Sequence, residues 1–271
     1  MNTRQILFFT ILTIGTGCKP ESWQYSRVIP LENITPIGII RDTDNLWVSD
    51  VSNNRLVKLS LTGEIIGLYD GFRRPMNIAL SRSDNTLYVP EYFTDTVRIF
   101  KNGKISTLQL KNLPDSPAGV AVYKGYIAIA DFFGHRIILK NNGDEIIIGQ
   151  KGHEFGDLYY PTDVAFYKDE LFVADAYNNR VMVYDLKGNK LKAIGYEDGI
   201  NVATGIEVAD EWVFVTDFHG NRVLIYDLLG NLQRILTEGI NEPTDLSYSK
   251  KDKLLYIANY GDSSILVYQK K

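Results

Sequence analysis

Three residues with oxygen-bearing side chains each stand two positions after a proline, and together they could bind a cation. They are Asn77, Asp163 and Asp245. Carboxylate and amide oxygens that converge on one point suit a hard divalent cation, above all calcium. The alternative is that each side chain caps the local backbone, as Asp and Asn commonly do at the start of a segment. The sequence leaves both interpretations open.

Aromatic residues form a second group of candidates, because they follow an acidic or amide residue at the same place in several related segments. The candidate binding residues are Tyr92, Phe93, Phe132, Phe133, Tyr177, Phe218, His219 and Tyr260. Aromatic side chains on exposed loops are costly unless they bind something or pack against a neighbour. We expect a ligand-binding face here, with packing between repeats as the alternative.

Four aspartates are each followed by an arginine five residues later. The pairs are Asp50 and Arg55, Asp131 and Arg136, Asp175 and Arg180, and Asp217 and Arg222. Where the acid is replaced, by Glu91 or Asn259, the arginine is replaced too, by Thr96 or Ser264. Arginine suits the bidentate geometry of a carboxylate. Partners that change together indicate structural ion pairs rather than catalytic acids.

The three histidines fall in loops that we expect on the same face as the aromatic residues. They are His135, His153 and His219. Three histidines could hold zinc with one open position. Their spacing contains no close pair of ligands, which favours three unrelated loop residues.

All these residues recur because the chain contains six copies of one segment, clearest as FVADAYNNRVMVY at 172–184. The acidic or amide residue, here called the anchor residue, is Asp50, Glu91, Asp131, Asp175, Asp217 and Asn259 in turn. Subtracting neighbouring positions gives spacings of 41, 40, 44, 42 and 42 residues. A period of roughly 40 to 45 residues with several strands is typical of a propeller blade. The sequence therefore predicts an all-β fold, a six-bladed β-propeller with four-stranded blades.

The fourth copy shows the strands most clearly, and it predicts them at 161–166, 171–174, 180–184 and 191–194. The last copy ends after three strands, whereas residues 24–29 form a spare strand before the first copy. An open ring would leave an unpaired strand edge. We therefore expect the N-terminal strand to complete the last blade and close the ring.

Composition narrows the class of partner. The net charge is −4 and no basic run is present, which argues against nucleic acid as a partner. The single cysteine excludes an internal disulfide. A protein or a small molecule is the expected ligand.

The N-terminus resembles that of a bacterial lipoprotein. Residues 1–17 combine a basic start at Arg4 with an apolar stretch and small residues before Cys18, which is typical of a signal peptide. A small residue before the only cysteine resembles a lipobox and implies lipidation of Cys18, with a plain secretory signal as the alternative. Residues 18–23 would form a lipid-anchored linker and 24–271 the propeller. Lys19 in place of Asp implies the outer membrane of the cell envelope, on its periplasmic or outer side.

The blades resemble NHL repeats over about residues 36–268, in a proline-led inner strand, an apolar strand ending in Asp, and Asn-Asn-Arg-Val. Related six-bladed propellers include peptidyl-hydroxyglycine lyases, paraoxonases and gluconolactonases. The lyases place zinc histidines beside the inner-strand prolines, where this chain has no histidine. The resemblance therefore implies a non-enzymatic binding module first. The alternative is a metal-dependent hydrolase or lyase of the lactonase or lyase type, with a cation at the propeller axis.

Lipid anchoring can be tested by one substitution. Cys18→Ser should release the protein from the membrane fraction, because the acylated side chain is lost. Cell fractionation and immunoblotting measure this, and a serine variant that stays with the membranes would contradict the lipobox interpretation.

Overall fold

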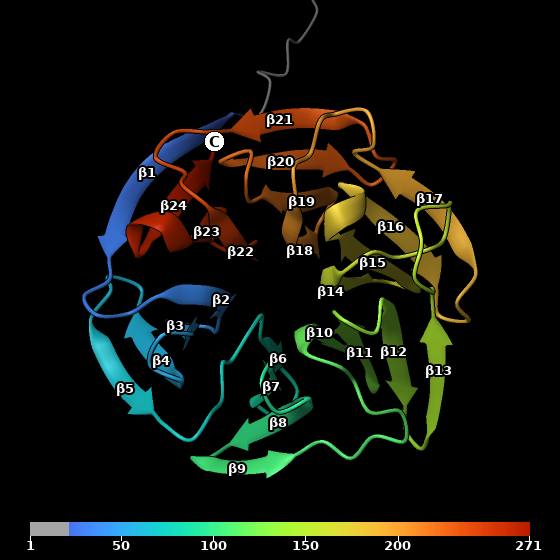
Figure 1. Ribbon diagram of the computed structural model, residues 1–271. Helices are drawn as coiled ribbons and strands as arrows, with labels where there is room; N and C mark the ends of the chain where they lie inside the picture. The colour runs from blue at the N-terminus through green and yellow to red at the C-terminus, as the bar shows by residue number, and fades with distance from the viewer. Residues whose placement is uncertain (1–21) are drawn as a thin grey trace, which may run out of the picture.

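The structure is a computed structural model that describes residues 22–271. Six four-stranded antiparallel sheets stand round a central axis, as Figure 1 shows. The first two blades are β2 (Pro36–Arg41), β3 (Asn45–Asp50), β4 (Arg55–Ser60) and β5 (Ile65–Tyr69), then β6 (Ala79–Ser81), β7 (Thr86–Glu91), β8 (Thr96–Lys101) and β9 (Lys104–Thr107). Blades 3 and 4 are β10 (Pro117–Tyr123), β11 (Tyr126–Asp131), β12 (Arg136–Asn141) and β13 (Asp144–Ile148), then β14 (Pro161–Tyr167), β15 (Glu170–Asp175), β16 (Arg180–Asp185) and β17 (Lys190–Ile194). Blades 5 and 6 are β18 (Ala203–Ala209), β19 (Trp212–Asp217), β20 (Arg222–Asp227) and β21 (Leu232–Leu236), then β22 (Pro243–Ser249), β23 (Leu254–Asn259), β24 (Ser264–Lys270) and β1 (Trp23–Pro30).

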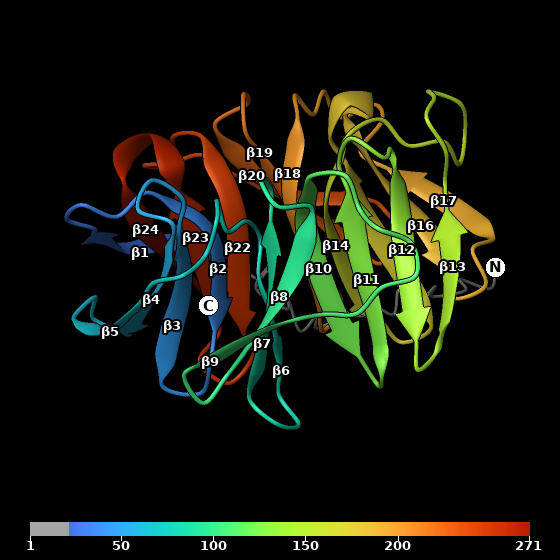
Figure 2. The ribbon, with the colours of Figure 1, turned by 60° about the horizontal axis from the view of Figure 1, so that its bottom comes forward.

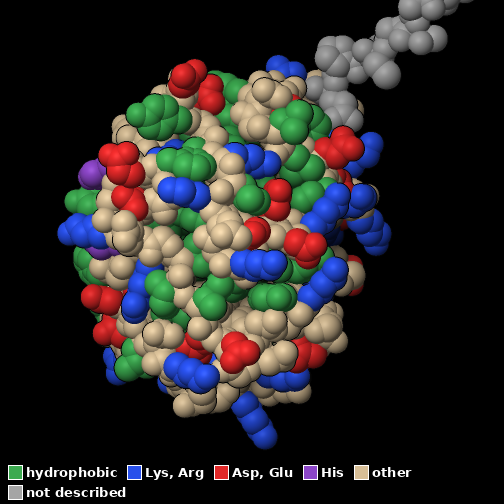
Figure 3. Space-filling model, turned by 90° about the vertical axis from the view of Figure 1, so that its right-hand side faces the viewer, with side chains coloured by type: hydrophobic (Ala, Val, Ile, Leu, Met, Phe, Trp, Pro, Cys, Tyr) green, Lys and Arg blue, Asp and Glu red, His purple; other side chains and the backbone are tan. Residues whose placement is uncertain are grey.

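The predicted fold is thus confirmed. Two short 3-10 helices, η1 (Ala176–Asn178) and η2 (Tyr260–Asp262), lie in the loops after β15 and β23. Figure 2 shows both on one face of the ring. On the wall beside β13 and β17, Figure 3 shows basic and acidic side chains interspersed.

Blade 2 differs from the other five blades, because its inner strand is short. Only Ala79–Ser81 pair regularly with β7, and Pro75 contributes an isolated bridge to Glu91. The N–H of Asn77 donates instead to the carbonyl oxygen of Ala118 in blade 3, at 3.0 Å. Around Asn77 the backbone therefore bonds to the neighbouring blade, and regular pairing within blade 2 begins only at Ala79.

The N-terminal strand closes the ring. β1 pairs antiparallel with β24 from Trp23 opposite Lys270 to Pro30 opposite Ser264. Its Trp23 ring also contacts Phe214 of blade 5, with 5.5 Å between ring centroids. The strand begins one residue before the predicted segment and ends one residue after it.

The apolar core lies between blades. Six clusters of buried side chains each draw on two neighbouring blades, so that every blade interface has its own cluster. In the interface of blades 4 and 5, for example, Phe172 and Val183 pack with Val215 and Tyr226. Burial of apolar area is the main favourable term in folding, so each blade depends on both its neighbours.

Each anchor residue holds its own blade together. Asp50 is fully buried, and its Oδ2 accepts a hydrogen bond from Arg55 Nε at 2.8 Å. Its Oδ1 accepts the backbone N–H of Thr35, at 3.0 Å. The other three aspartates have the same arrangement, which confirms the structural ion pairs. In blade 2 the hydroxyl of Thr94 donates to Glu91 in place of an arginine.

A second set of hydrogen bonds joins successive blades. The residue just before each of strands β4, β8, β12, β16 and β20 has a left-handed backbone conformation. Its side chain accepts the N–H of the residue that stands directly before the next blade. The acceptors and donors are Asn54 and Arg74, Asp95 and Ser116, His135 and Tyr160, Asn179 and Val202, and Asn221 and Glu242. The second residue of Asn-Asn-Arg therefore links one blade to the next.

Ring closure can be tested by deletion. Removing residues 19–30 should lower the melting temperature by roughly 6–24 °C. Loss of the buried Ile29 and the partly buried Trp23 alone costs about 3–6 kcal/mol, and a domain of this size loses roughly 2–4 °C per kcal/mol. Deletion of residues 19–21 is the control, because it stops before β1. Equal melting of the two deletions would show that β1 is dispensable.

Candidate functional site

Seven aromatic side chains form a continuous band across blades 2, 3 and 4. We call this set the aromatic band: Tyr92, Phe93, Phe132, Phe133, Tyr159, Tyr160 and Tyr177. Ring centroids lie 6.0 Å apart between Tyr92 and Phe132, 4.8 Å between Phe132 and Tyr160, and 5.1 Å between Tyr160 and Tyr177. The structure thus brings together five of the eight predicted binding residues.

The other three predicted binding residues form a separate, smaller group in blades 5 and 6. The Phe218 ring lies 5.0 Å from His219 and 6.2 Å from Tyr260. Within residues 22–271 no ring contact joins this group to the aromatic band. All eight residues lie in loops that follow the second strand of a blade, as predicted. Their ring contacts, however, divide them into two separate groups.

The side chains of the aromatic band differ in how much of their surface is exposed to solvent. Phe93 is 67% exposed, Tyr177 53% and Phe133 45%. Tyr92, Phe132 and Tyr160 are half-buried beneath them. Packing between blades accounts for the second set, whereas the first set presents much of its ring surface to solvent.

Tyr159 and Tyr160 are members of the band that the sequence did not indicate, because they stand before a blade and not after an anchor residue. Tyr160 precedes Pro161 and has a φ of 55°, a strained conformation for an aromatic residue. The hydrogen bond from its N–H to His135 Nδ1, 3.0 Å long, holds it there. The sequence could have indicated Tyr160 by its position, because the residue before each inner-strand proline lies beside the loop of the preceding blade.

A pocket of about 200 Å³ opens at the axis beside the band. Its lining is Ile37, Arg74, Met76, Asn77, Tyr92, Ala118, Phe132, Thr162, Thr204 and Thr244. The three threonine hydroxyls donate to carbonyl oxygens of the next blade at 2.8–3.0 Å. The lining therefore combines apolar side chains with threonine hydroxyl oxygens that can still accept hydrogen bonds from a ligand.

The histidines do not form one site. His135 and His153 both contact Tyr159, at 5.2 and 4.7 Å between ring centroids, whereas His219 belongs to the other aromatic group. Burial lowers the pKa of His135, which suits a neutral ring whose Nδ1 accepts a hydrogen bond. Among residues 22–271 no three His, Cys, Asp or Glu side chains are grouped to hold a metal ion.

The three predicted cation ligands make hydrogen bonds between blades. Asp163 Oδ2 accepts the N–H of Ile206 at 2.9 Å, and Asp245 Oδ2 accepts the N–H of Ile39 at 2.7 Å. Asn77 reaches across the axis, where its Nδ2 donates to the carbonyl oxygen of Thr204 at 3.3 Å. A cation would have to replace these bonds or share their oxygens. Cation binding at these residues stays a prediction, and the backbone bonds reach further than the local capping that we considered.

Glycine makes the close approach of the inner strands possible. A Cβ on Gly119 would lie 2.6 Å from Asp163 Oδ1, and one on Gly205 would lie 2.7 Å from Asp245 Cα. Real Cβ atoms have no such contacts, so any side chain at these positions would force the strands apart. This explains why glycine alternates with Asn or Asp round the axis.

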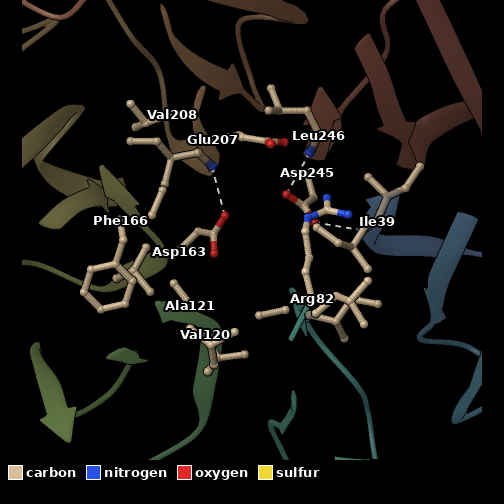
Figure 4. A pocket seen from close by; sticks show the side chains of 18 residues that line it. Ile39, Arg82, Val120, Ala121, Asp163, Phe166, Glu207, Val208, Asp245 and Leu246 are labelled. Carbon is tan, nitrogen blue, oxygen red and sulfur yellow. Dashed lines mark hydrogen bonds between the residues drawn. The ribbon is translucent and has the colours of Figure 1, made fainter. Parts of the chain in front are cut away.

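A second cavity, of about 260 Å³, lies deeper along the axis (Figure 4). Asp163, Glu207 and Asp245 face it from three blades, and Arg82 lies at its edge. Burial raises the pKa of both aspartates, and it raises that of Glu207 to about 7. The sequence did not indicate Glu207, because it falls within a strand whose neighbours are apolar.

Solved structures with the same architecture include a gluconolactonase, a lyase and a nidogen/laminin complex. A gluconolactonase from Xanthomonas campestris has a TM-score of 0.73 and 15% identity, covering 94% of this chain and 96% of its own. A streptogramin B lyase has a TM-score of 0.69 and 14% identity, covering 93% and 98%. A nidogen/laminin complex has a TM-score of 0.68 and 18% identity, covering 79% and 85%. At these identities the likeness shows the fold, a six-bladed β-propeller.

Sequence comparison adds no relative, since no protein-family model and no curated protein matches the chain. NHL-repeat membership therefore stays a resemblance. Within residues 22–271 no helix is long and apolar enough to cross a membrane.

The buried carboxyl groups predict a pH dependence of stability. Asp163 and Glu207 hold their protons up to about pH 7 when folded, but release them near pH 4 when unfolded. The stability that these two groups contribute to the fold is fully present below about pH 4, and it is lost as the pH rises through about 7. Asp163→Asn with Glu207→Gln should therefore reduce the fall in melting temperature between pH 5 and pH 8.

Asp115→Asn is the matched control, because this side chain is exposed. Thermal melts at both pH values measure the slope. A double variant with the wild-type slope would rule out protonated axial carboxyl groups.

Proposed function

We propose that this protein is a binding module for a small molecule or a protein segment, and that its binding surface is the aromatic band with the adjoining axial pocket. One observation carries the proposal: rings from three blades meet in a continuous surface whose upper members are exposed. Phe93, Phe133 and Tyr177 present about half or more of their surface to solvent. Exposed apolar groups that gather beside a pocket are typical of a binding site.

The chemistry of the band favours a ligand with flat faces. Tyrosine and phenylalanine present π-systems to a ring, and aromatic contacts contribute about 0.5–1.5 kcal/mol each beyond the area they bury. The tyrosine hydroxyls and the threonine oxygens of the pocket supply hydrogen bonds. Sugar rings and aromatic rings both fit this combination.

Export and anchoring complete the proposal. Residues 1–17 and Cys18 lie outside the described residues, so signal peptide, lipid anchor and envelope location come from the sequence alone. In that setting the ligand would be an extracellular or periplasmic compound. The charge balance argues against nucleic acid as a partner.

Phenyl-β-D-glucoside is a neutral probe that offers both kinds of ring. Phe133→Ala and Tyr177→Ala should each weaken its binding by about two- to tenfold, because each removes one ring contact. Phe155→Ala is the control, since Phe155 is 45% exposed, like Phe133, but lies outside the band. Titration calorimetry or ligand-observed NMR measures the dissociation constants. Binding that is unaffected in both band variants would remove the aromatic band as the site.

A second candidate is a hydrolase or lyase that uses a divalent cation at Asn77, Asp163 and Asp245. It is supported by the gluconolactonase and the lyase among the similar structures. Calcium would then stabilise the protein by about 2.7 kcal/mol at a hundredfold excess over the dissociation constant. Asp163→Asn with Asp245→Asn should abolish this response. A melting temperature that neither calcium nor EDTA changes would exclude the candidate.

A further inference from the structure

We infer that the ligand of the aromatic band carries a carboxylate group, and that Arg74 at the mouth of the axial pocket binds it. This inference rests on the proposed function and names the class of ligand for the same site. The class is a ring compound with one carboxylate, either an acidic sugar or an aromatic acid.

The fold fixes the position of Arg74. Its φ is 51°, and its N–H donates to Asn54 Oδ1 at 2.7 Å. Its guanidinium carbon lies 5.2 Å from the centre of the Tyr92 ring and 5.3 Å from that of Phe93. Stacking on two rings leaves the edge of a guanidinium free for planar, bidentate recognition of an anion. Arg74 also lines the pocket, so its charge is at the place where a ligand would enter.

Arg74 has no ionic partner within residues 22–271. Arg55, Arg136, Arg180 and Arg222 pair with the anchor aspartates, and Arg41 pairs with Asp252. The guanidinium of Arg74 makes neither an ion pair nor a hydrogen bond there, and its buried Nε has no acceptor.

Two acids lie near Arg74 without pairing with it. Glu91 accepts the N–H of Arg73 at 2.9 Å and the hydroxyl of Thr94 at 2.7 Å. Asp115 is exposed and lies close enough to Tyr92 to act on the pKa of its hydroxyl. Neither carboxylate comes within ion-pair distance of the guanidinium, whose charge is thus left for a ligand.

Pocket size and charge narrow the class further. Pockets for drug-sized ligands measure roughly 300–1,000 Å³, so a volume of about 200 Å³ takes a single ring. One guanidinium matches the single charge of a carboxylate. Around Arg74 the other lining residues are uncharged, which makes a phosphate dianion the poorer fit.

The test uses the purified full-length protein and two matched pairs of probes. Phenyl-β-D-glucuronide and phenyl-β-D-glucoside differ by one carboxylate on the sugar, and benzoate and benzamide by one on the aromatic ring. Within the preferred pair the acid should bind at least about tenfold tighter than its neutral counterpart, since hydrogen bonds to charged groups are the strong ones. The pair that shows the preference identifies the source of the carboxylate.

Variants of two adjacent arginines complete the design. Arg74→Gln should remove the preference, so that the acid and its neutral counterpart bind with equal dissociation constants. Arg73→Gln is the control, because Arg73 is exposed and only its backbone N–H is used. If the melting temperature shows that Arg74→Gln does not fold, Arg74→Lys replaces it, and a reduced preference is expected.

The outcomes separate the two levels of the proposal. Equal binding of acid and neutral probes, or a preference that persists without Arg74, overturns the carboxylate inference while the binding module stands. Tighter binding of phenyl phosphate than of any carboxylate also overturns it. Failure of every probe to bind removes the proposed function together with the inference.

Discussion

The hydrogen bonding of the buried anchor residue, a carboxylate in five of the six blades, is the interaction on which the rest of the ring depends. A charge that is fully buried is tolerated only when it is paired and hydrogen-bonded. Asp175 meets this condition with Arg180 on one oxygen and the N–H of Tyr159 on the other. The strand, the loop after it and the connection into the blade are therefore fixed to one another. The left-handed residue that follows, Asn179, can then reach the next blade.

This arrangement explains why the loop face is free to carry function. Each loop needs its anchor residue and its left-handed residue, but the two positions after the anchor differ in side chain from blade to blade. In blade 1 they are Val51 and Ser52, whereas blade 3 has Phe132 and Phe133 in a loop of the same geometry. A surface can therefore be built there without altering the ring, which agrees with a fold that hosts many functions.

The arrangement at the axis depends on a separate constraint, which is the limited space that six inner strands share. Gly119 and Gly205 let neighbouring strands approach, and the aspartates of the next blades then accept backbone N–H groups across the gap. Asn77 spans the axis to Thr204, so the pocket beside the aromatic band and the deeper acidic cavity are distinct spaces. Ligand binding on the loop face and proton binding in the interior can thus be studied independently.

By itself the sequence determined the number of blades, the ion pairs within them and the closure of the ring. The period gave the six blades, the +5 spacing gave the ion pairs of the anchor residues, and the missing last strand gave closure by β1. Each of these depends on residues of one blade or on a count of strands, which a linear pattern records.

Only the tertiary structure decided what lies between blades. It placed Tyr160 beside His135 and Phe132, and it put Glu207 in the axial cavity. Among residues 22–271 it provides no ion-pair partner for Arg74. The physical reason is that these contacts join residues from different blades, whose separation the closed ring sets. A repeat pattern specifies each blade but not how closely its neighbours approach, and that distance decides which side chains are buried, paired or left free.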